Sequence, residues 1–269
     1  MTRLQRLLHA NGGRPVLGAA VYFNDPIFLE VAARLGYQAA WIEMEHAPIS
    51  FGEAADLCRV SQGLGLLTMI RVPDSRRESI LKAAECGPDI IDVPMANTPD
   101  VLQDLLAQAR FAPLGARGCF SVSRALHYGL VENLSKAQQQ INNELCLIVQ
   151  IETREAAERA EELCAVEGVD IFIGPADLAA SLGVPGEPGH PLVRRAATKI
   201  IAAARRHGKH VASASGPADF SFWIDQGIDV LFCTNDIVAL RRGAELALRE
   251  AREAVTRLHA APAAQHGRP

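Results

Sequence analysis

The sequence predicts a (β/α)8 barrel, and three observations support this fold class. Short apolar segments of strand length alternate with amphipathic segments of helix length along most of the chain, which is typical of a parallel sheet with crossover helices. Eight such units follow one another. The length of 269 residues suits a single barrel of this kind. A doubly wound open sheet is the structural alternative.

The predicted strands are apolar runs bounded by polar residues or glycine. In chain order they cover 16–23, 39–44, 66–72, 90–95, 145–152, 169–173, 210–214 and 230–234. Helix signals lie between them. Gly36 ends the helix expected at 25–35, Ser50 can cap the next one, and Thr98 with Pro99 opens the helix after the fourth strand. The last helix is expected at 237–258.

We expect one barrel domain over residues 1–258 and a flexible tail over 259–269. The stretch 111–144 is too long for a bare connection, and connections of that length are often functional. It includes a polar helix at about 132–143, and a loop rich in Gly and Pro follows the sixth strand at 181–190. The last helix carries one apolar stripe, so it must pack on something: residues 240, 244, 247, 248, 251 and 255.

Composition and charge argue against several classes of partner and location. The formal net charge is −4 and no long basic run occurs, which argues against nucleic acid as a partner. No apolar stretch approaches the ~18 residues of a membrane span, and the first residues lack the apolar core of a signal peptide. The 6 cysteines form no Cys-x-x-Cys pair, which suits reduced thiols and a cytoplasmic location.

Two carboxylates at strand ends stand out. The apolar strand 145–152 finishes with Gln150 and Glu152, and strand 169–173 runs directly into Gly174-Pro175-Ala176-Asp177. A carboxylate at the end of an apolar strand is costly without a partner. Two neighbouring strands that end this way can hold a divalent cation with hard oxygen ligands. A helix N-cap for Asp177 and a salt bridge for Glu152 are the plainer interpretation.

Other polar residues fall on the same predicted rim. The second strand ends at Glu43-Met44-Glu45-His46 and the third at Arg71. In a barrel, the carboxyl ends of the strands carry the chemistry, so this set suits a metal-assisted acid–base site. Each residue also has a structural explanation, because a histidine after a strand often anchors a loop and an arginine there often pairs with a neighbouring acid.

Six stretches carry a resemblance to a known family, in the order in which that family has them. They are Trp41-Ile42-Glu43-Met44-Glu45-His46-Ala47-Pro48, Ile70-Arg71-Val72-Pro73, Val93-Pro94-Met95-Ala96-Asn97-Thr98, Pro113-Leu114-Gly115-Ala116-Arg117-Gly118, Gln150-Ile151-Glu152-Thr153 and Phe172-Ile173-Gly174-Pro175-Ala176-Asp177-Leu178. On these residues the chain resembles the HpcH/HpaI aldolase family, the metal-dependent class II pyruvate aldolases. The resemblance extends over nearly the whole chain, from Leu17 to about Leu248.

The resemblance implies roles for the predicted rim. Glu152 and Asp177 would be the metal ligands, and Gln150 and Ala176 would contact the substrate. The implied cofactor is a divalent cation, Mg²⁺ or Mn²⁺, with Co²⁺ or Zn²⁺ as further candidates. A metal that chelates the keto and carboxylate oxygens of pyruvate acidifies its methyl group and stabilises the enolate.

The resemblance also implies that His46 is the catalytic base and that Arg71 stabilises the developing enolate. The family usually has Asp where this chain has Glu43, and Asp where it has Glu85. The second of these orients the catalytic histidine, so Glu85 is the expected partner of His46. The segment 119–124 is polar and bulky where relatives have small residues, and we expect it to shape the aldehyde end of the site.

These features together predict a metal-dependent aldolase that reversibly cleaves a 4-hydroxy-2-oxoacid to pyruvate and an aldehyde. Its partners would be small 2-oxoacids and aldehydes. The resemblance implies a homohexamer, a trimer of dimers, with the last helix exchanged between barrels, although its stripe would equally suit packing on its own barrel. A related lyase or synthase for an oxaloacetate- or acyl-CoA-type substrate is one alternative, and a non-catalytic paralogue is another.

Overall fold

The computed structural model describes residues 1–260 and shows a closed barrel of eight strands. The strands are hydrogen-bonded in chain order, every neighbouring pair is parallel, and the eighth strand pairs with the first. This confirms the predicted (β/α)8 barrel and excludes the open sheet, which would leave two unpaired edges. Residues 261–269, most of the predicted tail at 259–269, lie outside the described residues.

The strands match the predicted ranges to within two residues. They are β1 (Val16–Val21), β2 (Ala39–Glu43), β3 (Leu67–Arg71), β4 (Ile90–Val93), β5 (Cys146–Ile151), β6 (Val169–Ile173), β7 (Val211–Ala214) and β8 (Val230–Asn235). The helices are α1 (Arg3–Ala10), α2 (Pro26–Leu35), α3 (Phe51–Gly63), α4 (Arg77–Glu85), α5 (Pro99–Ala109), α6 (Leu134–Glu144), α7 (Arg154–Glu158), α8 (Ala160–Cys164), α9 (Pro175–Ser181), α10 (Pro191–Arg206), α11 (Phe220–Asp225) and α12 (Asp236–Ala260). Two 3-10 turns are η1 (Arg124–Gly129) and η2 (Pro217–Asp219).

The helix signals in the sequence act as predicted. Ser50 and Glu53 form a reciprocal capping box at the start of α3, and Thr98 accepts a hydrogen bond from the backbone of Val101 where α5 begins. Gly36 ends α2 with φ 94°, a left-handed conformation that glycine adopts without strain. These local signals set where each helix begins and ends around the barrel.

The inside of the barrel is apolar through its amino end and its middle. Leu4 of α1 is buried beneath the strands and packs in the same cluster as the inward residues of the barrel. Above it, the rings of Trp41, Phe172 and Phe232 pack together, with centroids 5.1 to 6.4 Å apart. A Cβ at Gly18 would lie 2.5 Å from the Phe232 ring, so glycine is required there. The interior is therefore a packed core and not a pore.

A second, larger apolar cluster lies between the strands and the surrounding helices. Outward-facing strand residues such as Ile70 and Val149 pack against helix residues such as Ile80 and Leu102. Because side chains alternate along a strand, the inward residues of the same strands remain free to build the interior and its upper rim. Among the described residues, no helix has the length and apolarity that crossing a bilayer requires.

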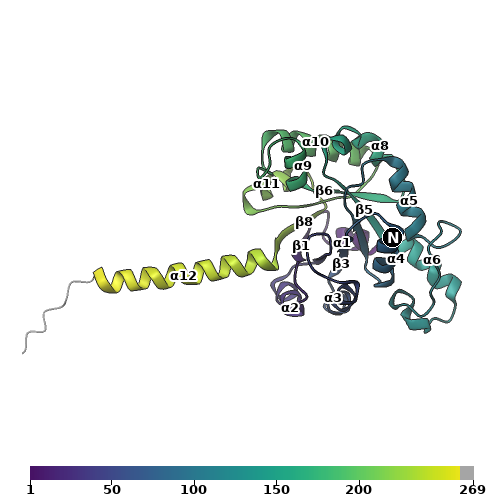
Figure 1. Ribbon diagram of the computed structural model, residues 1–269, viewed down its shortest axis with the longest axis horizontal. Coiled ribbons are helices and arrows are strands. Elements are labelled where there is room, and N and C mark those ends of the chain that lie inside the picture. The colour runs from purple at the N-terminus through teal and green to yellow at the C-terminus, as the bar shows by residue number, and fades with distance from the viewer. Residues whose placement is uncertain (261–269) are drawn as a thin grey trace, which may run out of the picture.

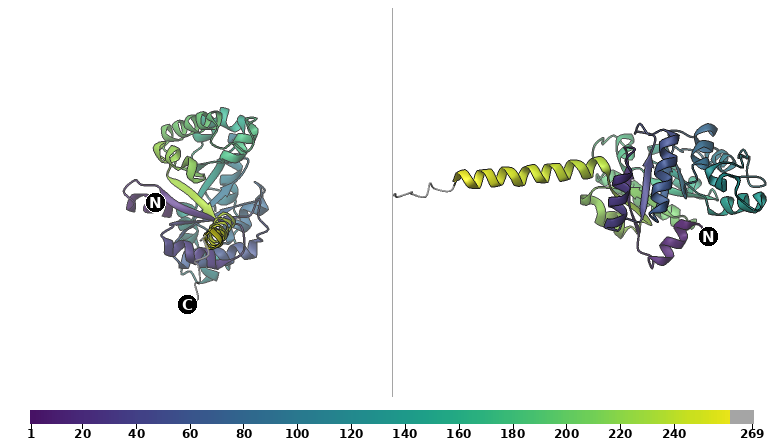
Figure 2. Two further views of the ribbon diagram at one scale, coloured as in Figure 1. Left: turned by 90° about the vertical axis from the view of Figure 1, so that its left-hand side faces the viewer. Right: turned by 90° about the horizontal axis from the view of Figure 1, so that it is seen from below.

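The last helix does not pack on its own barrel. Figures 1 and 2 show α12 leaving the barrel after β8 and projecting away from it as a single rod. Apolar side chains are exposed along it, at Ile237, Leu240, Leu246, Leu248 and Val255. Exposed apolar residues also line α2, at Ile27, Val31 and Leu35. Among residues 1–260, no apolar surface covers the exposed apolar side chains of α12.

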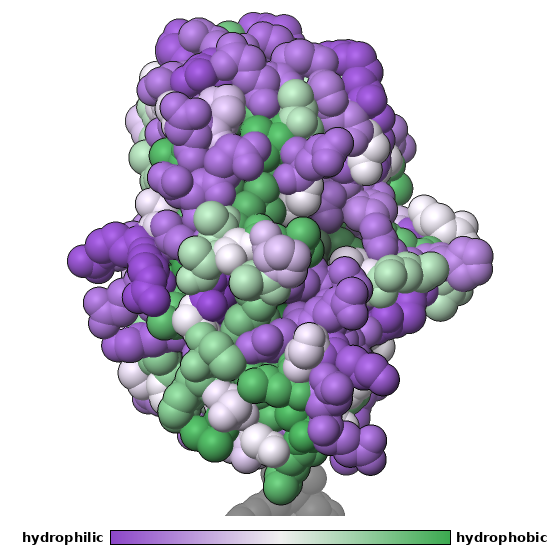
Figure 3. Space-filling view, turned by 90° about the vertical axis from the view of Figure 1, so that its right-hand side faces the viewer, coloured by the Kyte–Doolittle hydropathy of each residue, from purple (hydrophilic) through white to green (hydrophobic). Residues whose placement is uncertain are grey.

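The connection 111–144 lies at the opposite end of the molecule from α12 (Figure 1). It contains η1 and α6 and exposes several apolar side chains: Leu114, Phe120, Val122, Tyr128 and Leu130. Figure 3, which looks at this side of the molecule, shows apolar side chains gathered in the middle and lower part of the face. The connection is thus an ordered structure at the amino end of the barrel.

Candidate active site

The uppermost inward layer of the barrel is polar, unlike the layers below it. It consists of four buried side chains from four consecutive strands, namely Glu43, Arg71, Asp92 and Gln150. Arg71 lies opposite Glu43 in the register of β2 and β3, and opposite Asp92 in the register of β3 and β4. A buried polar layer at the carboxyl end of a barrel is where an active site is expected.

Glu43 organises the turn that follows β2. Its Oε1 accepts hydrogen bonds from the backbone N–H groups of Glu45 (2.7 Å) and His46 (3.0 Å). Its Oε2 accepts one from Nε of Arg71 at 2.6 Å. A fully buried carboxylate needs such partners, and three donors supply them here. Glu43 therefore fixes both the strand-end turn and the guanidinium of Arg71.

Arg71 is the centre of the polar layer. Its Nη1 donates to Oε1 of Gln150 at 3.3 Å and lies 3.2 Å from Oε2 of Glu45. The guanidinium lies over the ring of Trp41, 4.9 Å from the centroid, so the aromatic layer supports it from below. Gln150 in turn donates from Nε2 to Oδ2 of Asp92 at 2.5 Å. The guanidinium is held on several sides in one orientation.

Glu152 lies above this layer, at the end of β5, with one oxygen unsatisfied. Its Oε1 accepts from the backbone N–H of Met95 at 2.8 Å, and Met95 adopts a left-handed φ of 56° to present that group. Its buried Oε2 has no hydrogen-bond partner among the described residues. Burial, and then the nearby carboxylates of Asp177 and Glu45, raise the pKa of Glu152 to about 7.

The plainer interpretations of the two strand-end carboxylates are not what the structure shows. Gly174 occupies the N-cap position of α9 with no side-chain cap, and Asp177 stands in the first turn with an exposed side chain. Glu152 bonds to a backbone group and not to a cation. A Cβ at Gly174 would lie 2.6 Å from Oε2 of Glu152, so glycine at this position lets β6 approach the carboxylate. Ala176 is exposed beside Asp177.

His46 lies at the rim, with its side chain 58% exposed and Nε2 3.7 Å from Oε2 of Glu45. Glu45 therefore stands between His46 and Arg71. Burial raises the pKa of Glu45, and Arg71 and His46 oppose that rise. The sequence motif 41–48 contains both Glu43 and Glu45 and does not show that Glu45 lies between the two predicted catalytic residues.

The structure does not bring Glu85 to His46 within the chain. Glu85 is the last residue of α4, and its Oε1 accepts from Nη2 of Arg117 at 3.0 Å. Because α4 runs from the end of β3 back to the start of β4, Glu85 lies at the amino end of the barrel. His46 follows β2 at the carboxyl end, and the nine residues of α4 alone span about 13 Å. The expected pairing of Glu85 with His46 is thus not made inside one chain.

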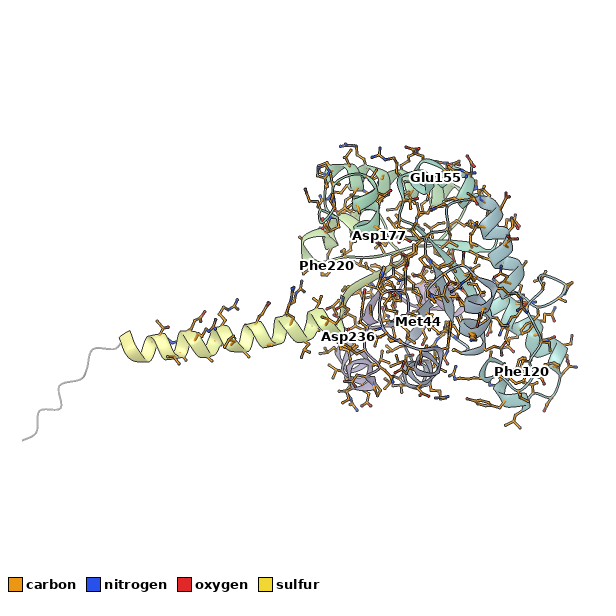
Figure 4. The ribbon with its side chains drawn as sticks, in the orientation of Figure 1. Met44, Phe120, Glu155, Asp177, Phe220 and Asp236 are labelled. Carbon is orange, nitrogen blue, oxygen red and sulfur yellow. The ribbon has the colours of Figure 1, made fainter. Side chains whose placement is uncertain are left out.

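The segment 119–124 also lies toward the amino end of the barrel, away from the rim. Cys119 and Phe120 line a groove with Phe51 and Leu81 on the outside of α3 and α4. Figure 4 shows Phe120 far from Asp177, near the opposite end of the barrel. The prediction that this segment shapes the aldehyde end of the site is therefore not met within one chain.

The rim fits a divalent cation. Glu45, Glu152 and Asp177 are close enough to influence one another electrostatically, and the buried Oε2 of Glu152 lacks a donor. No cluster of three or more His, Cys, Asp or Glu side chains in metal-binding geometry occurs in the part of the chain that the structure describes. Mg²⁺-type ions commonly take one or two carboxylates and fill the other positions with water and substrate.

Comparison with known proteins agrees with this geometry. The sequence profile of the HpcH/HpaI aldolase/citrate lyase family matches residues 21–219, which include every rim residue described above. The chain belongs to the HpcH/HpaI aldolase/citrate lyase family. Membership makes it an enzyme of the carbon–carbon lyase class, and members of this family generally use a divalent metal ion.

Relatives and solved structures support the assignment. The chain is 36% identical to a hydroxypyruvate/pyruvate aldolase from Sagittula stellata over 68% of this chain and 72% of the relative. It is 34% identical to a 2-keto-3-deoxy-L-rhamnonate aldolase from Klebsiella pneumoniae over 73% of each chain. The structure of a family protein from Burkholderia cenocepacia superposes with a TM-score of 0.85 at 30% identity, over 93% of this chain and 98% of that one.

Proposed function

We propose that this protein is a class II pyruvate aldolase that reversibly cleaves a 4-hydroxy-2-oxoacid to pyruvate and an aldehyde. The observation that carries the proposal is the position of Glu152 and Asp177 directly beside the layer of Arg71 and Gln150. Two carboxylates that can share a cation and one guanidinium whose Nη2 makes no hydrogen bond among the described residues then meet at one rim. A 2-oxoacid supplies the anion and chelates the cation.

Glu152 and Asp177 are the proposed ligands of Mg²⁺ or Mn²⁺. Carboxylate oxygens suit these hard cations, and Oε2 of Glu152, which has no hydrogen-bond partner among the described residues, can bind one. When bound, the metal would act as a Lewis acid on the oxygens of the 2-oxoacid.

Arg71 is proposed to stabilise the charge that develops on the enolate oxygen. Its Nε and Nη1 are used by Glu43, Gln150 and Glu45, and no hydrogen bond within the described residues uses Nη2. Because the guanidinium is already fixed, it needs no reorganisation when charge develops in the transition state. Gln150 and the backbone at Ala176 are proposed to contact the 2-oxoacid, since both border the same rim.

His46 is proposed to accept the proton of the 4-hydroxyl group in the cleavage direction. An exposed imidazole at the rim can reach a substrate that lies over the two proposed metal ligands, Glu152 and Asp177. Histidine also exchanges protons readily near neutral pH. Glu45, at 3.7 Å, is the carboxylate that faces its ring within the chain.

A homohexamer built as a trimer of dimers is the proposed assembly. The projecting α12 exposes an apolar stripe, and α2 exposes Ile27, Val31 and Leu35 on the barrel. Exchange of α12 between two copies would cover both surfaces. Neighbouring copies could then bring Glu85 and the 119–124 segment of one subunit to the rim of another.

We also propose a cytoplasmic location, since all six cysteines are free thiols.

A panel of 4-hydroxy-2-oxoacids with sugar-acid, dicarboxylic and short-chain aldehyde halves, screened for pyruvate release with added Mg²⁺ or Mn²⁺, tests the proposal. Metal-dependent release from at least one member is expected, and chelation should abolish it. Activity that persists in metal-stripped protein would instead indicate a Schiff-base lysine, and release from no member would contradict the proposal.

A synthase that uses an oxaloacetate-type substrate is the second candidate. The structure of the citrate synthase SbnG superposes with a TM-score of 0.82 at 25% identity, over 95% of this chain and 99% of that one. Oxaloacetate with an acyl-CoA partner therefore belongs in the same screen. Condensation in the absence of any pyruvate release would favour this candidate over the aldolase.

A further inference from the structure

One carboxylate of the polar layer has no part in the mechanism described so far. Asp92 is fully buried on β4, and its neighbours along the strand are aliphatic: Ile90, Ile91 and Val93. Its side chain faces inward one layer above Ile90, which belongs to the apolar interior. Burial of a carboxylate at this position destabilises the fold, and an aliphatic residue would avoid that cost. A functional reason is therefore needed.

Asp92 is connected to the reactive rim by hydrogen bonds through Gln150. Its Oδ2 accepts from Nε2 of Gln150 at 2.5 Å, and Oε1 of Gln150 accepts from Nη1 of Arg71 at 3.3 Å. Arg71 has only donors, so the amide oxygen of Gln150 must face it. Asp92 provides the matching acceptor on the other side, so the two neighbours together fix which way the amide points.

This arrangement leaves one N–H of the Gln150 amide available. The amide nitrogen carries two hydrogens, of which Asp92 takes one. Without the acceptor at residue 92, the amide could rotate about its terminal bond and its oxygen could leave Arg71. The guanidinium would then be held by Glu43 and Glu45 alone, both on the β2 side.

We infer that Asp92 is a positioning residue of this enzyme, which holds the Gln150 amide and through it the guanidinium of Arg71 in the orientation that meets the developing enolate. The inference rests on the proposed aldolase function. In this role Asp92 contributes to catalysis by fixing the orientation of Gln150, because Asp92 itself touches neither substrate nor metal. An acceptor oxygen at position 92 is then sufficient.

Four variants of the full-length protein separate this role from a structural one. Asp92→Asn keeps the size and an acceptor oxygen, Asp92→Val removes the acceptor, and Gln150→Leu with the double variant completes a cycle. Ile90→Val is the matched control, since it trims an inward residue of the same strand that lies outside the hydrogen-bonded chain. The measurements are kcat and KM for pyruvate release with Mg²⁺, and the melting temperature of metal-free protein.

Asp92→Val should lower kcat about tenfold with little change in KM, because the lost hydrogen bond acts on the transition state. Asp92→Asn should retain kcat to within about threefold, and Ile90→Val should leave it unchanged. Adding Asp92→Val to Gln150→Leu should cause no further loss. All variants should melt cooperatively, which shows that a lower kcat does not come from unfolding.

Several outcomes would overturn the inference. Wild-type kcat in Asp92→Val would remove the positioning role, and equal losses in Asp92→Asn and Asp92→Val would make charge and not geometry the relevant property. Losses that multiply in the double variant would show that Asp92 does not act through Gln150. A wild-type protein that cleaves no substrate and exchanges no methyl protons of pyruvate for deuterium would overturn the proposed function itself, and the role of Asp92 with it.

Discussion

The two ends of the barrel differ in how their carboxylates are paired with cations. At the amino end, carboxylates meet cations: Asp89 lies 3.0 Å from Arg3, and Asp229 lies 2.8 Å from Arg205 and faces His210. These groups also accept backbone N–H bonds at the starts of strands, as Asp89 does from Thr68. Their geometry is complete without a ligand, and they serve the fold.

At the carboxyl end, acids outnumber cations. Glu43, Glu45 and Asp92 surround the single guanidinium of Arg71, and Glu152 and Asp177 lie beside them. Burial raises the pKa of Asp92 well above its usual value, and Oδ1 of Asp92 and Oε2 of Glu152 are buried without a hydrogen-bond partner among the described residues. Such an arrangement is unfavourable unless a cation joins it. The difference between the two ends lies in the balance of charge: at the amino end the buried Arg117 has Glu85 as its partner, whereas at the carboxyl end the acids exceed the cations beside them.

Removal of the proposed metal ligands should have the largest effect on turnover. Glu152→Gln and Asp177→Asn should reduce metal-dependent turnover below detection, because each leaves one carboxylate to hold the ion. Metal-free Glu152→Gln should melt no lower than the wild type, since a buried charge has been removed. Pyruvate release and thermal melting are the measurements.

The control for these variants is Glu155→Gln. Glu155 is exposed on α7, three residues from Glu152, and lies away from Asp177 in Figure 4. Its turnover should equal that of the wild type. Wild-type turnover of Glu152→Gln or Asp177→Asn at saturating metal would mean that the ligands are assigned wrongly.

Arg71→Lys comes next in size. Lysine keeps the charge but cannot bond Glu43 and Gln150 at once as the planar guanidinium does. We expect kcat to fall about 10²-fold or more if the contact is made mainly in the transition state. Arg76→Lys, an exposed arginine paired with Asp74, is the matched control and should change nothing. An effect confined to KM would reduce Arg71 to a binding residue.

Glu85→Gln tests the amino end, where Arg117 is completely buried beside it. Loss of the carboxylate leaves the guanidinium without its ion-pair partner, so the free energy of unfolding should fall by about 1–3 kcal/mol. Glu78→Gln, on the exposed side of the same helix, should change stability far less. Urea unfolding of both variants measures the difference.

The same variant tests whether Glu85 reaches His46 from another subunit. Inside one chain the two residues lie at opposite ends, so a catalytic role of Glu85 beside His46 requires an oligomer. Turnover is therefore compared at a temperature at which both the variant and the wild type are fully folded. Mixed oligomers of Glu85→Gln and His46→Ala should then regain activity, because some sites combine the intact His46 of one chain with the intact Glu85 of the other. Unchanged turnover in Glu85→Gln would show that His46 acts without it.

Most of the fold could be predicted because its signals are local. Strand periodicity, the capping box at Ser50 and the terminating Gly36 act within a few residues, and each was found as expected. The first helix was missed, although Thr2 and Gln5 form a capping box, because its apolar face is short and contacts the barrel only from below. The direction of α12 could not be predicted from the sequence, because an apolar face on a helix does not indicate which surface packs against it.

The site was only partly predictable for the same reason. Strand-end positions placed Glu152, Asp177, Arg71 and Gln150 on one rim, because parallel strands share their carboxyl end. The resemblance paired Glu85 with His46, but helix α4 carries Glu85 to the other end of its own chain. Asp92 gave a signal that was overlooked, a carboxylate inside an otherwise aliphatic strand.

The smallest expected effect concerns His210, at the amino end of the barrel. The carboxylate of Asp229, 3.7 Å from Nδ1 of His210, raises the pKa of His210, and the nearby Asp170 adds to the rise. A raised pKa in the folded state means that the pair stabilises the fold fully below about pH 6.5, the usual value in an unfolded chain. That contribution is lost as the pH rises through the folded pKa.

His210→Gln should therefore lower the melting temperature more at pH 6 than at pH 8.5. Asp229 keeps its bonds to Arg205 and to the backbone of Val211 in this variant, so no buried charge is left alone. A partly exposed pair of this kind contributes about 0.5 kcal/mol, which corresponds to about 1–2 °C in a chain of this size. The exposed His9→Gln variant is the control and should show the same small difference at both pH values. Equal destabilisation of His210→Gln at pH 6 and pH 8.5 would show that the imidazole supports the start of β7 by packing and not by charge. Fewer ion pairs would then stabilise the amino end than its geometry indicates.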